Sequence, residues 1–268
     1  MLKIGIVGCG AIGSYLAATV VRRYPNRIML SGVCELDPEK VTRLQRSLKK
    51  KIRQYPLAKL VDKSDLIIEA AGAGVVPEVV NTASVRGKDV MVMSAGGLLL
   101  HPDLLTRAQS RGIRVYVPSG AIAGLDALKA AKAGKIYRVT LTTTKPLKGL
   151  AGAPFILKHN IDLNAIKKER VIFNGSALEA VAVFPQNINV AAILSLAGIG
   201  PKKTRVCIVA SRLVKRNIHT IEIEGDFGTI RSCAENVPSK ANPKTSALAM
   251  LSAVAMLEGM IDGKRIGT

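Results

Sequence analysis

Three glycines near the N-terminus, Gly8, Gly10 and Gly13, have a spacing that allows the backbone to wrap around a phosphate group. Gly8 permits a tight turn, Gly10 lets the backbone approach a pyrophosphate, and Gly13 lets the following helix pack closely. The amides of Ala11 and Ile12 open that helix, where the helix dipole favours an anion. The spacing predicts a dinucleotide site; the alternative is a strand–turn–helix whose glycines serve packing alone.

An acidic residue and a small-residue loop extend this predicted cofactor site. Glu35 ends an apolar stretch and lies 35 − 13 = 22 positions after the last glycine, about where an acid meets the ribose hydroxyls. Ala71 and Gly72 end the next predicted strand, where loops face the cofactor crevice of such sheets. An acid at position 35 repels the 2′-phosphate of NADP, but a glutamate could swing aside, so the choice between NAD and NADP stays open.

His219 is the candidate for acid–base chemistry in the second half of the chain. It alternates with apolar Ile221 and Ile223 along a predicted strand that has one apolar face. An imidazole titrates near neutral pH and can act as a general acid or base. The alternative is a buried histidine that only satisfies a hydrogen bond in the core.

Polar residues at helix starts, and one lysine at the end of a strand, are the candidates for binding substrate. Asn187 and Asn189 precede an apolar helix and either cap it or bind a carboxamide or substrate. Lys145, Thr245 and Ser246 offer an ammonium group and hydroxyls that suit a carboxylate, although the hydroxyls could equally be caps. The sequence has no clustering typical of metal ligands.

The elements that must position these residues fall into two patterns. In the first half, apolar strands and helices alternate, with strands at 4–7, 28–34, 58–60 with 64–71, 89–93 and 112–117, and helices at 11–22, 76–86 and 102–109. This alternation predicts an α/β chain whose residues 1–118 form a Rossmann-type, doubly wound parallel sheet that binds a dinucleotide.

Strand patterns dominate from residue 119. They cover 137–144, 170–174, 204–210 and 217–224, with helices near 125–134, 177–184 and 189–196. We expect residues 119–241 to form an α+β substrate domain with an open, mixed sheet that has one covered face. A C-terminal helix within 242–268 is expected to pack back on the first domain.

Composition limits the partners. The formal net charge is +20, with 39 Lys and Arg against 19 Asp and Glu, but the densest basic run, 43–53, is typical of a solvated helix face and lacks aromatic residues for stacking on bases. Nucleic acid is therefore disfavoured as a partner. The apolar stretch 245–257 is too short to cross a membrane. We expect a cytoplasmic protein, since the first strand follows Met1 directly and the four cysteines show no C-x-x-C spacing. We also expect a homodimer, because open sheets of this kind often pair through a face or an edge.

Five segments together carry a resemblance to a known family: Gly8–Gly13, Ser119–Asp126, Phe184–Ala192, Asn217–His219 and Gly225–Gly228. Over nearly its full length the chain resembles the L-aspartate dehydrogenases. The resemblance implies oxidation of L-aspartate with NAD or NADP to iminoaspartate, which hydrolyses to oxaloacetate and ammonia and can feed quinolinate and NAD synthesis. It also implies that His219 is catalytic and that Ala123 and Asn189 contact the nicotinamide.

The implied reaction is hydride transfer from the substrate Cα to the nicotinamide. His219 would act as a base, either on the amine or on the water that attacks the imine. The alternative enzyme is an oxidoreductase resembling homoserine dehydrogenase or dihydrodipicolinate reductase, with another amino acid or a cyclic imine as substrate. The alternative outside enzymes is an NAD(P)H sensor that binds nucleic acid through its basic surface.

Overall fold

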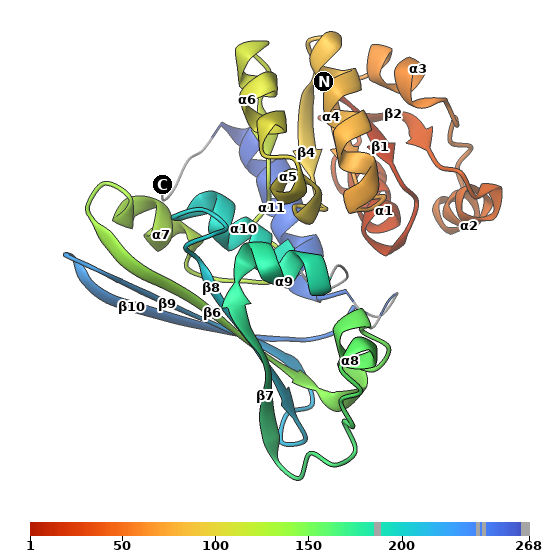
Figure 1. Ribbon diagram of the computed structural model, residues 1–268. Coiled ribbons are helices and arrows are strands. Elements are labelled where there is room, and N and C mark those ends of the chain that lie inside the picture. The colour runs from red at the N-terminus through yellow and green to blue at the C-terminus, as the bar shows by residue number, and fades with distance from the viewer. Residues whose placement is uncertain (185–188, 240–241, 243–244, 264–268) are drawn as a thin grey trace. The chain divides into compact units, whose positions relative to one another are not determined.

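The computed structural model describes residues 1–184, 189–239, 242 and 245–263. The chain divides into two compact units (Figure 1). The first comprises Met1–Pro118 together with the helical residues from Met250 onward, and the second comprises Ser119–Ala249.

The first unit is built on a parallel sheet. Its described strands are β1 (Leu2–Val7), β2 (Ile28–Cys34), β3 (Leu66–Glu69), β4 (Asp89–Val92) and β5 (Val115–Tyr116), in the order β2-β1-β3-β4-β5. Its helices are α1 (Ala11–Arg23), α2 (Pro38–Leu48), α3 (Leu57–Asp62), α4 (Val76–Val85), α5 (Gly96–Leu100) and α6 (Asp103–Ser110). The predicted Rossmann-type sheet is thereby confirmed. Because the order changes direction between β1 and β3, their carboxyl ends flank the point where such sheets bind ligands.

Apolar side chains from strands and helices form one core in this unit. Ile4 and Ile6 of β1 and Leu16 of α1 are completely buried in it. The helix α11 (Ala247–Asp262) adds Ala253, Val254 and Leu257 to the same core. At its edge Arg23 and Tyr24 contact Glu258, while Arg27 pairs with Asp262.

One local prediction for the first unit was wrong. Residues 58–60 form part of helix α3 rather than a strand, because Pro56 occupies the N-cap and the turn that follows buries Leu60 and Val61. The short helix α5, which begins at Gly96 soon after β4, was not predicted. Gly97 allows α5 to approach the start of α4 closely, since a Cβ there would lie 2.7 Å from the Val76 side chain and 2.5 Å from the Ala73 carbonyl oxygen.

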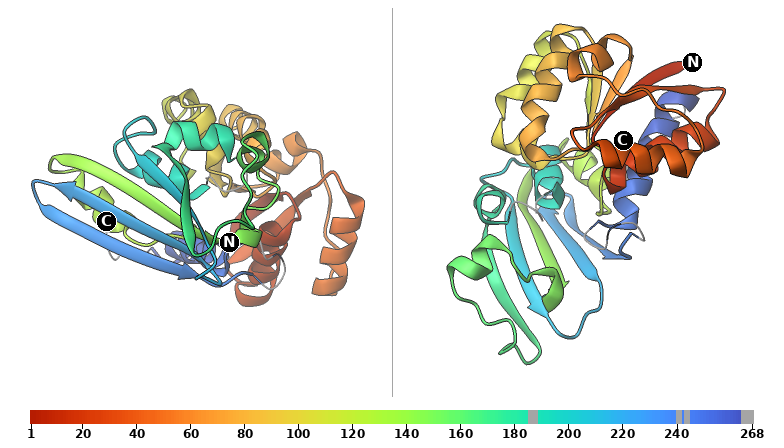
Figure 2. Two further views of the ribbon diagram at one scale, coloured as in Figure 1. Left: turned by 60° about the horizontal axis from the view of Figure 1, so that its bottom comes forward. Right: turned by 90° about the vertical axis from the view of Figure 1, so that its right-hand side faces the viewer.

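The second unit contains the mixed sheet. Its described strands are β6 (Ile136–Pro146), β7 (Glu169–Ser176), β8 (Arg205–Ser211), β9 (Asn217–Gly225) and β10 (Gly228–Asn236), in the order β10-β9-β6-β8-β7. Strands β6 and β8 are parallel and the other pairs antiparallel, as expected of a mixed sheet. Helices α7 (Leu125–Ala131), α9 (Ala177–Val183) and α10 (Asn189–Ala197) lie along one face of it, and α8 (Pro154–Lys158) follows β6 (Figures 1 and 2).

Strand β10 was not predicted from the sequence. It forms a hairpin with β9 across the short turn at Asp226 and Phe227, and its nine residues are paired along the whole length. Its side chains are small or polar over most of this run, and most of its residues are exposed. An edge strand of this kind is held by backbone hydrogen bonds rather than by an apolar face, so alternation gives little signal.

Candidate functional site

The glycine loop joins β1 to α1 and fits a bound pyrophosphate. Gly8 has φ +94°, and a Cβ there would lie 2.7 Å from the carbonyl oxygen of Ala70. A Cβ on Gly13 would collide with the carbonyl oxygen of Gly8, whereas one on Gly10 would meet nothing within 4 Å. Gly10 caps α1 without a side-chain hydrogen bond, and the first turn has no acidic residue. The amides of that turn are thus arranged as in anion sites.

Glu35, directly after β2, lies against the same loop. Its Oε2 accepts a hydrogen bond from the Cys9 amide at 2.7 Å, and its Oε1 accepts from the Leu36 and Asp37 amides. Burial opposes ionisation, but these amides and the ammonium of Lys40, 3.7 Å away, together lower the pKa of Glu35. The carboxylate is therefore ionised and fixed at the end of β2.

The Cys9 thiol within the glycine loop stays neutral. Burial, with the Glu35 charge as a second cause, raises its pKa to about 12. A neutral thiol adds no negative charge beside the position expected for phosphate.

Ala71 and Gly72 follow β3 at the β1–β3 switch point. Both donate their amides to the carboxylate of Glu69, at 2.8 Å each. Glu69 was not identified from the sequence, because one acid at the end of an apolar strand gives no signal of its own. Its buried position and its partners become visible only when the neighbouring strand β4 is in place.

The second unit places His219 and Thr143 directly opposite each other. They are paired across β9 and β6, and Thr143 Oγ1 lies 3.0 Å from His219 Nδ1. Both side chains are almost fully buried on the covered face of the sheet. Burial, together with the charge of Lys145, lowers the pKa of His219 to about 4. The imidazole is consequently neutral at neutral pH, with its orientation set by the threonine.

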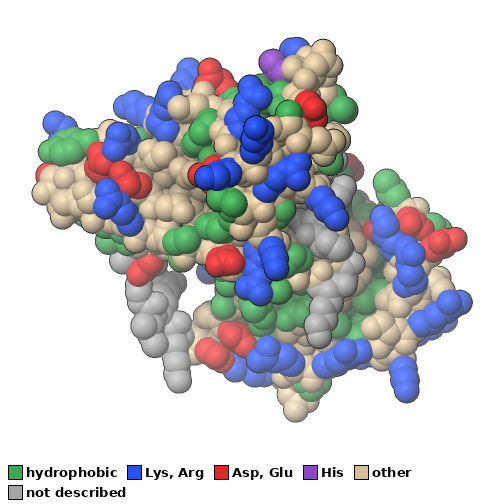
Figure 3. Space-filling view, turned by 90° about the horizontal axis from the view of Figure 1, so that it is seen from below, with side chains coloured by type: hydrophobic (Ala, Val, Ile, Leu, Met, Phe, Trp, Pro, Cys, Tyr) green, Lys and Arg blue, Asp and Glu red, His purple; other side chains and the backbone are tan. Residues whose placement is uncertain are grey.

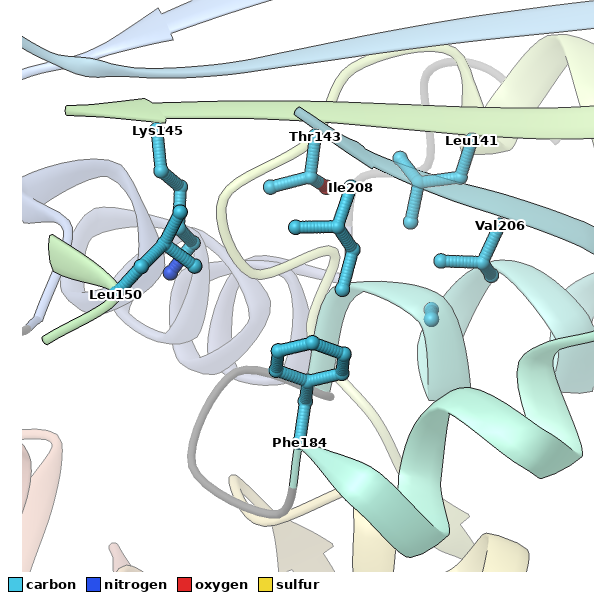
Figure 4. A pocket seen from close by; sticks show the side chains of 8 residues that line it. Leu141, Thr143, Lys145, Leu150, Phe184, Val206 and Ile208 are labelled. Carbon is cyan, nitrogen blue, oxygen red and sulfur yellow. The ribbon is translucent and has the colours of Figure 1, made fainter. Parts of the chain in front are cut away.

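Lys145 lies two residues beyond Thr143 and therefore on the same face of β6. Its side chain lines a hollow beneath the sheet, into which Thr143 also points (Figure 4). The rest of the lining is mostly apolar, formed by Leu141, Leu150, Phe184, Ala191, Val206 and Ile208. Only 5% of Lys145 is exposed, and burial lowers its pKa to about 8. A cationic amine in an apolar hollow attracts an anion, although the hollow as it stands has room for about one water molecule.

Asn236, at the end of β10, connects two other segments to this end of the sheet. Its amide nitrogen donates to the Ala121 carbonyl at 3.0 Å, and its Oδ1 accepts from the Ser246 hydroxyl at 2.6 Å. Two residues earlier, Ala234 lies opposite His219, so Asn236 and His219 share one face. Asn236 was not identified from the sequence, because its partners Ala121 and Ser246 are brought to it only by the fold.

The remaining predicted residues are placed as follows. The carbonyl of Ala123 accepts a hydrogen bond from Ser232 of β10 at 2.9 Å, and Asn189 is the exposed first residue of α10. Thr245 pairs through its backbone carbonyl with the Ser239 amide at 2.7 Å. Asn187 lies outside the described residues, as does the adjoining part of its segment.

Charge and hydropathy add three observations. Lys and Arg side chains are spread over the face seen in Figure 3, interspersed with fewer acidic ones. Within the described ranges, no group of three or more His, Cys, Asp or Glu side chains could hold a metal ion. No helix in the described part of the chain has the length and apolar character needed to cross a membrane.

Comparison with known proteins gives concordant matches for both units. A family model described as the C-terminal part of aspartate dehydrogenase matches residues 126–260, and one described as the NAD-binding domain of homoserine dehydrogenase matches residues 8–118. The chain is 45% identical to an L-aspartate dehydrogenase of Methanocella arvoryzae, with 100% of both chains covered. It is 41% identical to one of Bradyrhizobium diazoefficiens, covering 96% of this chain and 90% of that protein.

A solved structure shares the fold. The aspartate dehydrogenase of Thermotoga maritima matches with a TM-score of 0.77 at 23% identity, with both chains covered completely.

Proposed function

The chain belongs to the L-aspartate dehydrogenase family, and from this we propose that it oxidises L-aspartate with NAD or NADP. The product is iminoaspartate, which water converts to oxaloacetate and ammonia. The observation that carries the proposal is the buried Thr143–His219 pair beside Lys145 on one sheet face. It brings a neutral imidazole and an amine to the same small region, as a reaction on a dicarboxylic amino acid requires.

The first unit would hold the cofactor. Backbone amides from Gly10 to Gly13 would bind the pyrophosphate, Glu35 the ribose hydroxyls, and the backbone of Ala71 and Gly72 would line the opposite side. Bound NAD or NADP supplies the hydride acceptor. Ala123 and Asn189 are proposed as contacts to the nicotinamide.

We propose NAD as the preferred form. The Cys9 amide, 2.7 Å from Glu35 Oε2, holds the carboxylate in place, so moving it aside for a 2′-phosphate would sacrifice that hydrogen bond. The ammonium of Lys40, 3.7 Å from Glu35 Oε1, helps to lower the pKa of this carboxylate and so keeps it ionised. An ionised carboxylate fixed at this point favours free ribose hydroxyls.

His219 is proposed as the proton acceptor. If Nδ1–H donates to Thr143 Oγ1, Nε2 carries the lone pair and can take a proton from the substrate amine or from the attacking water. The nearby Lys145 contributes to the low pKa of His219. A bound dicarboxylate neutralises that positive charge and so raises the basicity of the imidazole.

Lys145 is proposed to hold a substrate carboxylate, with Thr245, Ser246 and Asn187 as further contacts. Lys145 and Thr143 line the same hollow (Figure 4). Ser246 is bonded to Asn236, which shares its sheet face with His219. The Ser246 hydroxyl donates its one hydrogen to Asn236 and accepts from the Leu248 amide, so it can accept one further bond, as from the substrate amine.

A reduction assay with matched variants tests this function. We expect L-aspartate with NAD or NADP to give NADH or NADPH, Thr143→Val to lower kcat, and Thr142→Val to leave it unchanged. Thr142 is the control because it precedes Thr143 on the same strand but points to the other face. Turnover with another amino acid but none with L-aspartate would refute the substrate assignment. Full activity of His219→Ala would refute the catalytic one.

We propose that two copies associate through the sheet face opposite the helices. There Val171, 54% exposed, lies opposite Val209, and the half-buried Cys207 is on the same face. Light scattering that gives the mass of a single chain would refute this.

We also propose a compartment and a metabolic role for the protein. The four free cysteines suit a reducing compartment such as the cytoplasm, and the iminoaspartate would serve quinolinate and NAD synthesis.

A further inference from the structure

Glu69 is a completely buried carboxylate at the carboxyl end of β3. Its Oε1 accepts hydrogen bonds from the amides of Ala71 and Gly72 and from the hydroxyl of Ser94, at 2.8, 2.8 and 2.9 Å. Its Oε2 accepts one from the amide of Ser94 at 3.0 Å. Ser94 follows β4, so this one side chain binds the loops after two neighbouring strands.

Burying a carboxylate is unfavourable unless polar partners replace water. No ion pair within the described residues involves Glu69, so the four hydrogen-bond donors provide the compensation. All four are N–H or O–H groups, which matches an acceptor-only carboxylate. An apolar side chain would fill the core without this penalty but would leave three backbone amides and a hydroxyl without their acceptor.

The loops that Glu69 joins support the glycine turn. The backbone of Ala70 and Ala71 packs so closely on Gly8 that a Cβ there would lie 2.7–2.8 Å from it. The Ala70 amide donates to the Val7 carbonyl at 2.8 Å, immediately before the turn. The carboxylate therefore fixes the backbone against which the phosphate-binding turn rests.

We propose that Glu69 is a positioning residue for dinucleotide binding. By holding the loops after β3 and β4 together, it fixes the backbone on the β3 side of the switch point before the cofactor arrives. The inference rests on the proposed NAD(P)-dependent function and assigns it a residue that makes no contact with substrate. Preorganisation of this kind increases affinity because less loop ordering has to accompany binding.

Two substitutions separate the role of the charge from that of the shape. Glu69→Gln keeps the size but replaces one oxygen by an NH₂ group. This group cannot accept the hydrogen bonds of the Ser94 amide, or those of the Ala71 and Gly72 amides, depending on which oxygen it replaces. Glu69→Asp keeps the charge and loses one methylene, so it can restore only part of the hydrogen bonding. Ser64→Ala is the matched control. Ser64 is buried just before the first residue of β3, at the end of the strand away from Glu69. Its hydroxyl donates to the Leu60 carbonyl at 2.7 Å.

The experiment is titration calorimetry of each full-length protein with NADH, at a temperature where circular dichroism shows it to be folded. We expect Glu69→Gln to raise the Kd for NADH by about tenfold or more, Glu69→Asp to raise it less, and Ser64→Ala to leave it unchanged. Should Glu69→Gln fail to fold, Ser94→Ala removes only the hydroxyl donor, and we expect a rise of about two- to fivefold.

A native Kd in Glu69→Gln, or in Ser94→Ala where that variant replaces it, would overturn the inference, even if the melting temperature falls. An equal rise in Ser64→Ala would also overturn it, because any buried hydrogen bond in the unit would then have the same effect. If the native protein binds neither NADH nor NADPH, the proposed function fails and the inference fails with it. Native binding without an effect of the Glu69 variants refutes the inference alone.

Discussion

The buried imidazole of His219 predicts a specific loss of stability in acid. Its pKa is about 4 in the folded chain, against 6.5 for an unperturbed histidine, mainly because of burial and then because of the Lys145 charge. Between these two values the unfolded chain binds a proton that the folded chain does not. The free energy of unfolding must therefore fall as the pH falls from 6.5 to 4. Above pH 6.5 the imidazole is neutral in both states, and its burial then costs no stability through protonation.

The magnitude follows from the two pKa values. Linkage gives a loss of about 2 kcal/mol at pH 5 and about 3 kcal/mol at pH 4, relative to neutral pH. His219 is only 6% exposed, so solvent screens this effect little. In His219→Gln the side chain can still bond to Thr143 but does not titrate. The difference in unfolding free energy between the native protein and this variant isolates the contribution of His219.

Urea unfolding followed by circular dichroism at several pH values from 7.5 to 4 measures this difference. We expect the native protein to lose about 2–3 kcal/mol more than His219→Gln over that range. A difference that stays constant within about 0.5 kcal/mol would refute the reasoning, because it would mean that the imidazole takes up its proton equally in both states. The same variant should also be inactive toward L-aspartate, since an amide cannot accept the proton.

Three further predictions concern the cofactor and the substrate. Glu35→Gln should improve kcat/KM with NADP relative to NAD by about tenfold, since a neutral amide no longer repels the 2′-phosphate; an unchanged ratio in initial-rate assays would contradict the proposed preference. Gly13→Ala should destabilise the first unit by on the order of 2–4 kcal/mol through collision with Gly8, whereas Gly10→Ala should melt normally yet bind NADH weakly. The KM for L-aspartate should rise above pH 8, where Lys145 loses its charge as its lowered pKa of about 8 is passed. A KM that stays flat to pH 10 would show that the ammonium does not hold the substrate.

The sequence predicted the features that depend on local patterns. The parallel sheet could be predicted from three local features: the three glycines, the buried strand before them and the acid after the next strand. Each of these constrains the structure strongly on its own. Helix α3 and strand β10 were not found for the opposite reason. Residues 57–62 are too few to show a helical period, and β10 is stabilised by pairing with β9 rather than by its own side chains.

The site depends on contacts that no local pattern contains. His219 could be singled out by its chemistry, but its partner Thr143 is set by the register of two strands separated by 76 positions. Glu69 and Asn236 are ordinary residues in sequence, and each acquires a role from a neighbour contributed by another part of the chain. Register and long-range hydrogen bonding are properties of the assembled sheets.

The position of α11 has a consequence for how the protein is made. The core around β1 and α1 is completed by Ala253, Val254 and Leu257 of α11. The second unit lies between α11 and the rest of the first unit in the sequence. During translation, α11 is therefore synthesised only after the second unit. Until then, part of the apolar surface of the sheet that carries the glycine turn stays exposed. A nascent chain in this state is a natural client for chaperones that shield apolar segments.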